Sequence, residues 1–172
     1  MATVTYLAYD VHSFKPYVVI VDDGGGLHEI RNVGGDDVAN LLHDLKVKNK
    51  KIKTLFIAAH ADSTVIQLRG DYILQANTSG VWIGDGHNLT DLTHDIRGLL
   101  DVGAVIQLAG CNTADGTHNH AYYMSMSFHN VSVMGSSFYT AQIPPTEYFL
   151  MNEKTYLNGG IVNTGWGFSG KP

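Results

Sequence analysis

The sequence predicts an α/β protein: a three-layer sandwich with a mainly parallel central sheet, helices on both faces and small peripheral hairpins. Three observations support this fold class. Strand-like apolar runs alternate with segments of helical periodicity, an order typical of parallel sheets covered by helices. Two of these runs, residues 52–59 and 102–109, are typical of buried central strands, and the later half of the first is apolar on both faces. Finally, 172 residues with 44 % hydrophobic and 16 % charged side chains fit one globular domain, residues 1–172.

The N-terminal third predicts two strands followed by a helix. Residues 4–9 and 17–21 are β-rich, and the second run stops at a glycine-rich turn, residues 22–26. From Asp36 the apolar residues follow a helical period, and acidic residues at the start and lysines at the end complement the helix dipole. The turn could instead bind phosphate, but it has neither the required glycine spacing nor a lysine, so a hairpin turn is favoured.

The remaining elements are predicted from similar patterns. Short apolar patches in residues 64–84 indicate a hairpin excursion after the strand at 52–59. Asn88 is expected to cap a second helix, and residues 115–117 to open a third, before a strand at 131–134. Two apolar patches, residues 148–151 and 155–157, suggest a hairpin near the C-terminus.

Charge and cysteine content exclude several classes of function. Lys+Arg 11 against Asp+Glu 16 gives a net charge of −5, without the basic stripe of a nucleic-acid-binding protein. No apolar run suggests a membrane span, and no signal peptide is evident, so a cytoplasmic protein is expected. The single cysteine, Cys111, excludes an intramolecular disulfide and Cys-rich metal sites. It is either a buried apolar residue or a reactive thiol.

The predicted topology brings His60 and Cys111 to one edge of the sheet. Each lies just past the end of a predicted central strand, and strands joined by a helical crossover run parallel. Ligands of such sheets bind at the carboxyl ends of the strands. A thiol nucleophile and an imidazole base are therefore expected together. The predicted third helix after Cys111 would lower the pKa of its thiol, and backbone N–H groups of Gly110-Cys111-Asn112 could hold an oxyanion.

An apolar strand ending in Leu55-Phe56-Ile57-Ala58-Ala59-His60-Ala61 precedes, by about 50 residues, another that ends in Gly110-Cys111-Asn112-Thr113-Ala114. These two motifs resemble the caspase-like, clan CD cysteine peptidases, especially bacterial relatives of the CHAT and clostripain kind. The resemblance covers roughly residues 52–140. It implies a cysteine endopeptidase acting on a protein or peptide substrate, without a cofactor or metal.

The resemblance also implies roles for individual residues. His60 would be the general base and Cys111 the nucleophile, with the backbone N–H groups of Ala61 and Cys111 forming an oxyanion hole. Ala61 stands where the family usually has glycine, and the chain is short for a complete caspase domain. The substrate would meet residues flanking the dyad and residues after the next strand: Asp62, Gly110, Asn112, Ser136, Ser137 and Phe138.

Two alternatives remain open from the sequence. A catalytically silent module of the same fold could bind a protein or a small signalling molecule at this edge. A hydrolytic metal site could use histidines with a carboxylate, although the spacing of His118 and His120 points their side chains apart on a helix. Its other possible ligands are His87, His94, His129 and Asp62.

Overall fold

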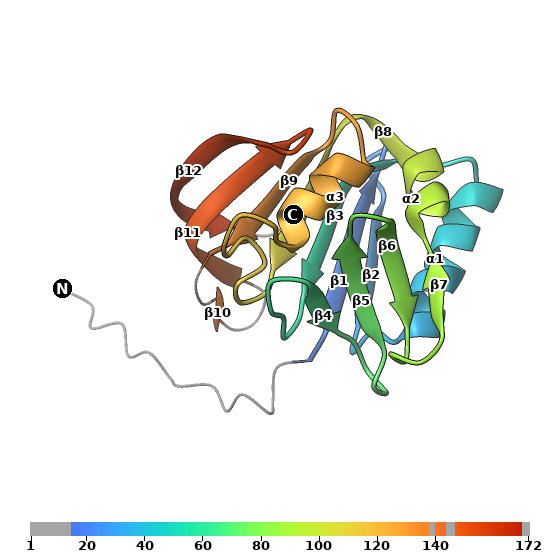
Figure 1. Cartoon of the computed structure of the whole chain (residues 1–172). Coiled ribbons are helices and arrows are strands. Elements are labelled where there is room, and N and C mark those ends of the chain that lie inside the picture. Colours follow the sequence, from blue (N-terminus) through green and yellow to red (C-terminus); the bar gives the residue numbers. More distant parts are fainter. Residues whose placement is uncertain (1–14, 138–139, 144–146, 170–172) are drawn as a thin grey trace.

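The computed structural model describes residues 15–137, 140–143 and 147–169, and places them in two sheets and three helices (Figure 1). The predicted strand at residues 4–9 lies outside the described residues. The large sheet has the order β10-β11-β9-β8-β3-β1-β2, and β12 also pairs with β11. Its strands, in that order, are β10 Thr140–Ile143, β11 Glu147–Leu157, β9 Ser132–Ser136, β8 Leu100–Ala109, β3 Ile52–Ala58, β1 Tyr17–Asp22, β2 Leu27–Arg31 and β12 Gly160–Ser169.

The prediction of a mainly parallel sheet is wrong, because the large sheet is mixed. Only the neighbours β3–β8 and β8–β9 run parallel, and the pairs β1–β2, β1–β3, β9–β11, β10–β11 and β11–β12 are antiparallel. A short turn joins β1 directly to β2, and such a turn can only produce antiparallel neighbours. The parallel segment is therefore confined to the middle of the sheet, which includes both strands predicted to carry the dyad.

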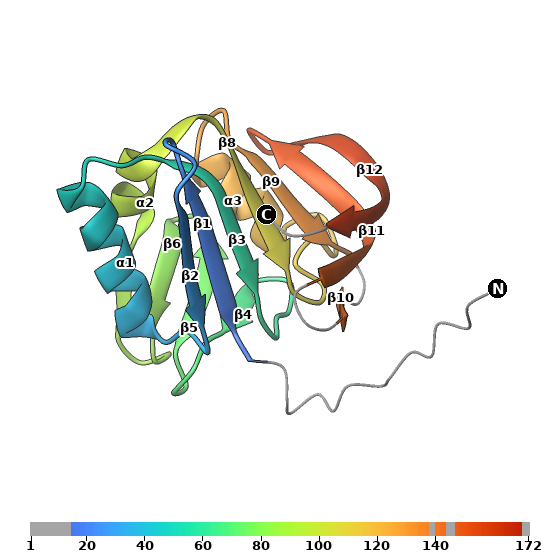
Figure 2. The same cartoon turned by 180° about the vertical axis from the view of Figure 1, so that it is seen from behind.

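The expected helices on both faces are also corrected. The helices α1 Gly35–Val47, α2 Thr93–Leu99 and α3 His120–Ser127 lie on the same side of the large sheet (Figures 1 and 2). Their apolar residues share one core with alternate residues of β1, β3 and β8, such as Ile20, Ile57 and Ile106. The opposite face forms a second buried cluster: Tyr17, Val19, Phe56, Ala58 and Ala109. An apolar strand face thus predicts that the face is buried, but not that a helix packs against it.

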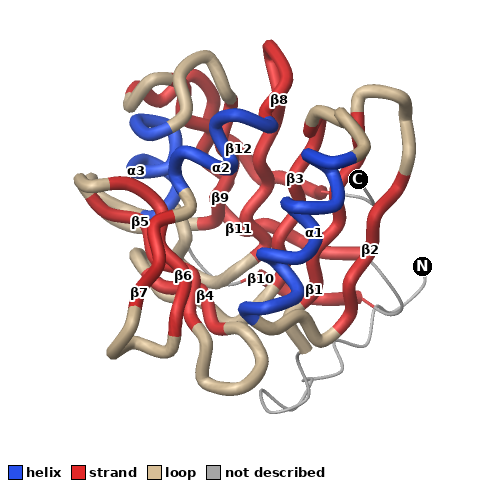
Figure 3. The backbone as a smooth tube through the Cα atoms, turned by 90° about the vertical axis from the view of Figure 1, so that its right-hand side faces the viewer, coloured by secondary structure: helices blue, strands red, loops and turns tan. Residues whose placement is uncertain are grey.

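The hairpin excursion is confirmed and forms a sheet of its own. It comprises β4 Val65–Gln67, β5 Ile73–Asn77, β6 Gly80–Gly84 and β7 Leu89–Asp91, all antiparallel. This small sheet lies with the helices on the same side of the large one (Figure 3). The helix predicted from Asn88 begins only at Thr93, because residues 89–91 pair with β6 and the Asp91 carboxylate accepts a hydrogen bond from the Thr93 N–H.

The first helix and the glycine-rich turn agree with the sequence. α1 has Asp36 and Asp37 in its first turn and Lys46 in its last. Residues 22–26 connect β1 and β2, and Asp22 Oδ1 accepts hydrogen bonds from the Gly24 and Gly26 N–H groups at 2.8 and 2.9 Å. The pKa of Asp22 is lowered to about 2, chiefly by its hydrogen bond to His28. The carboxylate therefore closes a hairpin turn, as predicted.

The C-terminal hairpin exists, but its turn lies later than predicted. Residues 148–151 and 155–157 belong to the same strand, β11, and β12 pairs with it from Leu157↔Gly160 onward. Asn158 and Gly159 form the turn, both with positive φ (50° and 80°). Asn-Gly is the strongest short hairpin signal, because both positions of this turn need positive φ. None of the helices in the described ranges has the length and hydropathy needed to cross a membrane.

Candidate active site

The middle of the large sheet brings the loops that carry His60 and Cys111 to one edge. β3 and β8 are parallel neighbours, and their register pairs Ala58 with Ala109, the last residue of each strand. Both strands point toward the same edge in Figure 1. His60 and Cys111 each follow their strand by two residues, so they leave the sheet at equivalent positions. Both side chains are partly exposed.

A close contact between the two loops accounts for the glycine that precedes Cys111. A Cβ atom at Gly110 would lie 2.6 Å from Ala61 Cβ and 3.0 Å from the Ala59 carbonyl oxygen. Real Cβ atoms essentially never approach other heavy atoms this closely, so the residue before Cys111 has no room for a side chain. Ala61 and Gly110, the immediate neighbours of the predicted base and nucleophile, are therefore in direct contact.

The loop after β3 turns back on itself at once. The His60 carbonyl accepts a hydrogen bond from the Gln67 N–H at 2.8 Å, and the Asp62 N–H donates to the Val65 carbonyl at 2.9 Å. These bonds lie on either side of the antiparallel bridge between Ala61 and Ile66. Ala61 and Ile66 are therefore a non-hydrogen-bonded pair, in which the two residues do not bond to each other. The Ala61 N–H therefore points away from Ile66.

The Asp62 carboxylate stabilises this turn. Its Oδ1 accepts hydrogen bonds from the Thr64 and Val65 N–H groups at 2.8 and 2.7 Å, an arrangement typical of an Asx turn. It is also 3.4 Å from the Thr64 hydroxyl. These contacts give Asp62 a local structural role, so a function in substrate binding requires the other oxygen of its carboxylate.

Thr113 organises the loop that follows Cys111. This buried side chain donates toward the Leu108 and Gly110 carbonyls, at 3.2 and 3.1 Å, and accepts a hydrogen bond from the Ser136 N–H at 3.1 Å. It thereby ties the end of β8 to the end of β9. Asn112, between Cys111 and Thr113, has a left-handed backbone with φ 60°, which turns the chain sharply. Thr113 is not among the residues predicted from the sequence; the signal that could have identified it is a β-branched hydroxyl directly after a tight turn.

The predicted third helix starts later than expected, which changes the surroundings of Cys111. α3 begins at His120, after a loop from 111 to 119 that includes Gly116, and Asn119 is its N-cap. The Ala121 N–H donates to the Thr113 carbonyl at 2.9 Å, and the Tyr122 N–H donates to the Asn119 side chain. These first-turn donors are thus satisfied within the loop and cap. The prediction that residues 115–117 open the third helix is wrong, because α3 begins at His120.

The residues expected in the substrate groove lie in different settings. Ser136 adjoins the Cys111 loop, because its carbonyl accepts a hydrogen bond from the Ala114 N–H at 2.8 Å. Ser137 faces β11 instead, since both its N–H and its hydroxyl donate to the Asn152 carbonyl. Phe138 lies outside the described residues. The structure thus groups Ser136 with Ala61, Gly110 and the loop around Asn112.

His120 lies fully buried beneath the loop that follows His60. Neither of its ring nitrogens makes a hydrogen bond of normal geometry within the described ranges, although the Thr64 backbone lies close enough to influence its pKa. Its pKa is lowered to about 4 from the usual 6.5, chiefly because burial disfavours the charged imidazolium. The Thr64 backbone and the Asp62 carboxylate oppose this shift. The sequence suggested His120 only as a metal ligand; in the structure it is a neutral core residue next to the candidate site.

Acidification should destabilise the protein through His120. Because its folded-state pKa lies below the unfolded value, the unfolded chain binds more protons between about pH 6.5 and about pH 4. The free energy of unfolding should therefore fall by about 3 kcal/mol as the pH is lowered through this interval. Urea unfolding at several pH values measures the loss. The loss attributable to Asp22 belongs to lower pH, as its pKa is about 2.

The control for this prediction is a His120→Met variant, whose side chain is apolar and does not titrate. Its unfolding free energy should fall much less over the same interval, whatever its value at neutral pH. NMR of the wild-type imidazole gives a second measurement, in which the ring stays neutral until about pH 4. Equal pH slopes in both proteins, together with a ring that titrates near 6.5, would contradict the assignment.

The histidines considered as metal ligands are not gathered in one place. No group of three or more His, Cys, Asp or Glu side chains suited to a metal occurs in the part of the chain that the structure describes. His118 packs against the Tyr122 ring, with centroids 5.1 Å apart, and hydrogen-bonds Thr117. Among the described residues, the metal-site alternative therefore lacks a ligand cluster.

Comparison with known proteins gives no match: no family model fits the chain, and no curated protein or solved structure is detectably similar to it.

Proposed function

We propose that this chain is a cysteine endopeptidase that uses His60 as general base and Cys111 as nucleophile. The observation that carries the proposal is the parallel, in-register pairing of β3 and β8, which end at Ala58 and Ala109 on one edge of the sheet. An imidazole and a thiol that follow such strands at the same offset are suitably placed for nucleophilic catalysis. The reaction type comes from the resemblance of the two strand-end motifs to clan CD cysteine peptidases.

In the proposed mechanism His60 accepts the proton of the Cys111 thiol, and the thiolate attacks the carbonyl carbon of a peptide bond. The resulting oxyanion would be held by the backbone N–H groups of Ala61 and Cys111. The orientation of the Ala61 N–H away from Ile66 supports this role. Protonated His60 then gives its proton to the leaving amine, and water attacks the acyl-enzyme thioester to release the second product.

The surroundings of the dyad also favour a defined geometry. The contact between Gly110 and Ala61 fixes the distance between the loops that follow β3 and β8. Hydrogen bonds of Thr113 connect the loop after Cys111 to the ends of β8 and β9. The Asp62 carboxylate closes the turn after His60. Catalytic groups that are held by packing and hydrogen bonds lose little freedom on reaching the reactive arrangement.

Alkylation of the only thiol tests the proposal most directly. Because a thiolate is the reactive species, iodoacetamide near neutral pH should modify Cys111 rapidly in the wild-type chain. We expect the rate to fall by about tenfold or more in His60→Ala, since an imidazole partner raises the thiolate fraction. Intact mass spectrometry over time measures both rates.

His94→Ala provides the matched control, because it also removes a solvent-accessible histidine. His94 lies on α2, before β8 begins, so it is not one of the residues that follow the ends of β3 and β8. Its alkylation rate should equal that of the wild type. Slow alkylation that is independent of His60 would contradict the enzyme and favour the silent binding module.

A further inference from the structure

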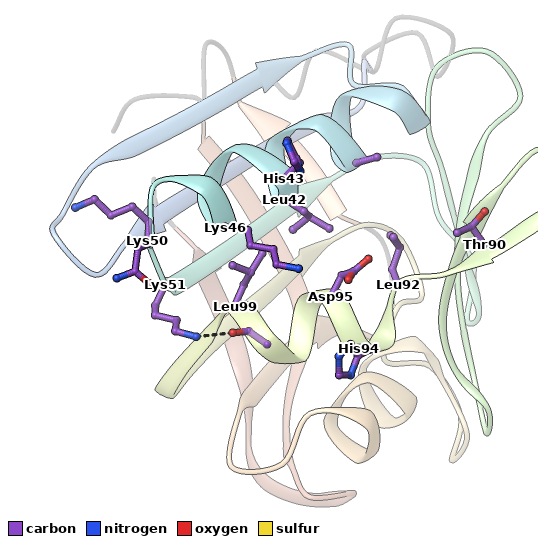
Figure 4. A pocket seen from close by; sticks show the side chains of 13 residues that line it. Leu42, His43, Lys46, Lys50, Lys51, Thr90, Leu92, His94, Asp95 and Leu99 are labelled. Atoms are coloured by element: carbon purple, nitrogen blue, oxygen red, sulfur yellow. Dashed lines mark hydrogen bonds between the residues drawn. The ribbon is translucent and has the colours of Figure 1, made fainter.

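A cavity of about 490 Å³ lies between α1 and α2, away from the candidate active site (Figure 4). It is bounded by α1, by the turn from α1 to β3, by β7 and by α2 with the residue before it. Lys51 and Leu99, which line it, directly precede β3 and β8, whereas His60 and Cys111 follow these strands. The cavity and the dyad therefore lie toward opposite ends of the same two strands. Its volume falls within the range of small-molecule sites.

The floor of this cavity is apolar. Leu42 from α1, Leu92 before α2 and Leu99 at the end of α2 line it, and each is less than a tenth exposed. These side chains already belong to the core, so the floor is held in place by packing that does not depend on a ligand. An apolar group of a ligand could thus displace water from a preformed surface.

The rim is cationic although the protein is acidic. Lys46, Lys50 and Lys51 line the cavity with a single carboxylate, Asp95, while the whole chain carries a net charge of −5. Lys48, the C-cap residue of α1, forms an ion pair with Asp44 at 2.8 Å. The three cavity lysines make no such pair with any carboxylate within the described ranges. Their charges are consequently not neutralised by ion pairing there.

The lysines take different positions around the cavity. Lys51 Nζ donates a hydrogen bond to the Gly98 carbonyl, which holds its ammonium at the α2 side and leaves two further donors. Lys46 extends across the cavity from α1 toward the side of Asp95 (Figure 4). Lys50 reaches toward the β1–β2 turn, where its charge helps to lower the pKa of Asp22. Lys46 and Lys51 are thus the two ammonium groups best placed to meet a ligand.

We propose that this cavity binds a small phosphate monoester with an apolar body. Lysine ammonium groups bind phosphate as point charges, and three of them line the cavity. A phosphate monoester carries between one and two negative charges near neutral pH, which complements the lysines. Its apolar part would cover the leucine floor, and Asp95 could accept a hydrogen bond from a ligand hydroxyl or amine.

Binding of phenyl phosphate to the full chain tests the proposal independently of any peptidase activity. Inorganic phosphate supplies the anion without an apolar body, and phenol supplies the ring without the charge. Isothermal titration calorimetry should show phenyl phosphate binding more tightly than either. In a Lys46→Gln, Lys51→Gln double variant the affinity should fall by about tenfold or more, which corresponds to about 1.4 kcal/mol.

Both substituted lysines are exposed, so the double variant should fold, and its circular dichroism and thermal unfolding serve as controls. Lys48→Gln is the matched control, since it removes a lysine of the same segment that does not line the cavity. Its affinity should equal that of the wild type. Equal binding of phenol and phenyl phosphate, equal weakening by Lys48→Gln, an unchanged affinity in the double variant, or no binding at millimolar concentration would each overturn the proposal.

Discussion

Cys111→Ala should abolish peptide hydrolysis while the chain remains folded. The variant removes one sulfur atom from a partly exposed loop position, so the change in unfolding free energy should stay within the common range of about 0.5–3 kcal/mol. Activity should vanish because the chain has no other cysteine that could form the acyl-enzyme. Cleavage of an unbiased peptide library measures the loss, with circular dichroism as the control for folding.

Cys111→Ser distinguishes the loss of the nucleophile from a change of shape. Serine is close to cysteine in size, but its hydroxyl is much harder to ionise at neutral pH, so this variant should also be nearly inactive. In the proposed mechanism the reactivity of the native thiol comes from His60 as its general base. If folded Cys111→Ala still cleaved peptides, the nucleophile would be misassigned.

His60→Ala should lower the rate of peptide hydrolysis by about 10²–10⁴-fold, the usual contribution of a general base. Asp62→Ala should have a much smaller effect, because the Asp62 carboxylate accepts hydrogen bonds from Thr64 and Val65 and so stabilises the turn. Steady-state kinetics on a peptide substrate, with the thermal stability of each variant, separates chemistry from folding.

Asp62→Asn is the informative control for this comparison, since the amide oxygen can still accept both backbone hydrogen bonds. It should restore the stability and most of the activity lost in Asp62→Ala. Equal losses of several orders of magnitude in His60→Ala, Asp62→Ala and Asp62→Asn would contradict the two-residue mechanism and indicate a triad in which the Asp62 charge is essential.

The parts of the fold that sequence predicts well are those with a local cause. The helix around Leu42 and Leu45 has both a periodic apolar face and complementary charges at its ends, and α1 forms there. The central strands at 52–59 and 102–109 have continuous apolar runs, and they form the parallel pair β3–β8. The interpretation of residues 22–26 as a hairpin turn succeeded because Asp22 and the glycines satisfy the turn within a few residues.

The errors arise where tertiary contacts override a local pattern. Leu89 fits a helical face, yet residues 89–91 pair with β6, so the helix begins four residues later. Residues 115–117 have the composition of a helix start. The loop after Cys111 is instead held to the end of β9 through Thr113, and α3 starts only after its N-cap, Asn119. Strand directions depend on which connections are tight turns, a property that apolar runs do not reveal.

The candidate site shows the same division. The placement of His60 and Cys111 past neighbouring strand ends follows from the order of elements, whereas the contact of Ala61 with Gly110 depends on atomic packing between the two loops. Thr113 was missed because its three hydrogen bonds reach the ends of two separate strands. His120 was noticed for its chemistry, but its burial depends on how α3 packs under the loop of Asp62 and Thr64.

The long connection between β3 and β8 also has a consequence for the order in which the protein folds. β4 to β7 are sequential hairpin neighbours, so the small sheet can form from short-range contacts, whereas the pairing of β3 with β8 must close a loop across it. Non-local pairing of this kind tends to form late. A nascent or partly unfolded chain would then carry the Cys111 thiol without its proposed imidazole partner, so the proposed peptidase activity would be delayed until the core of the large sheet is complete.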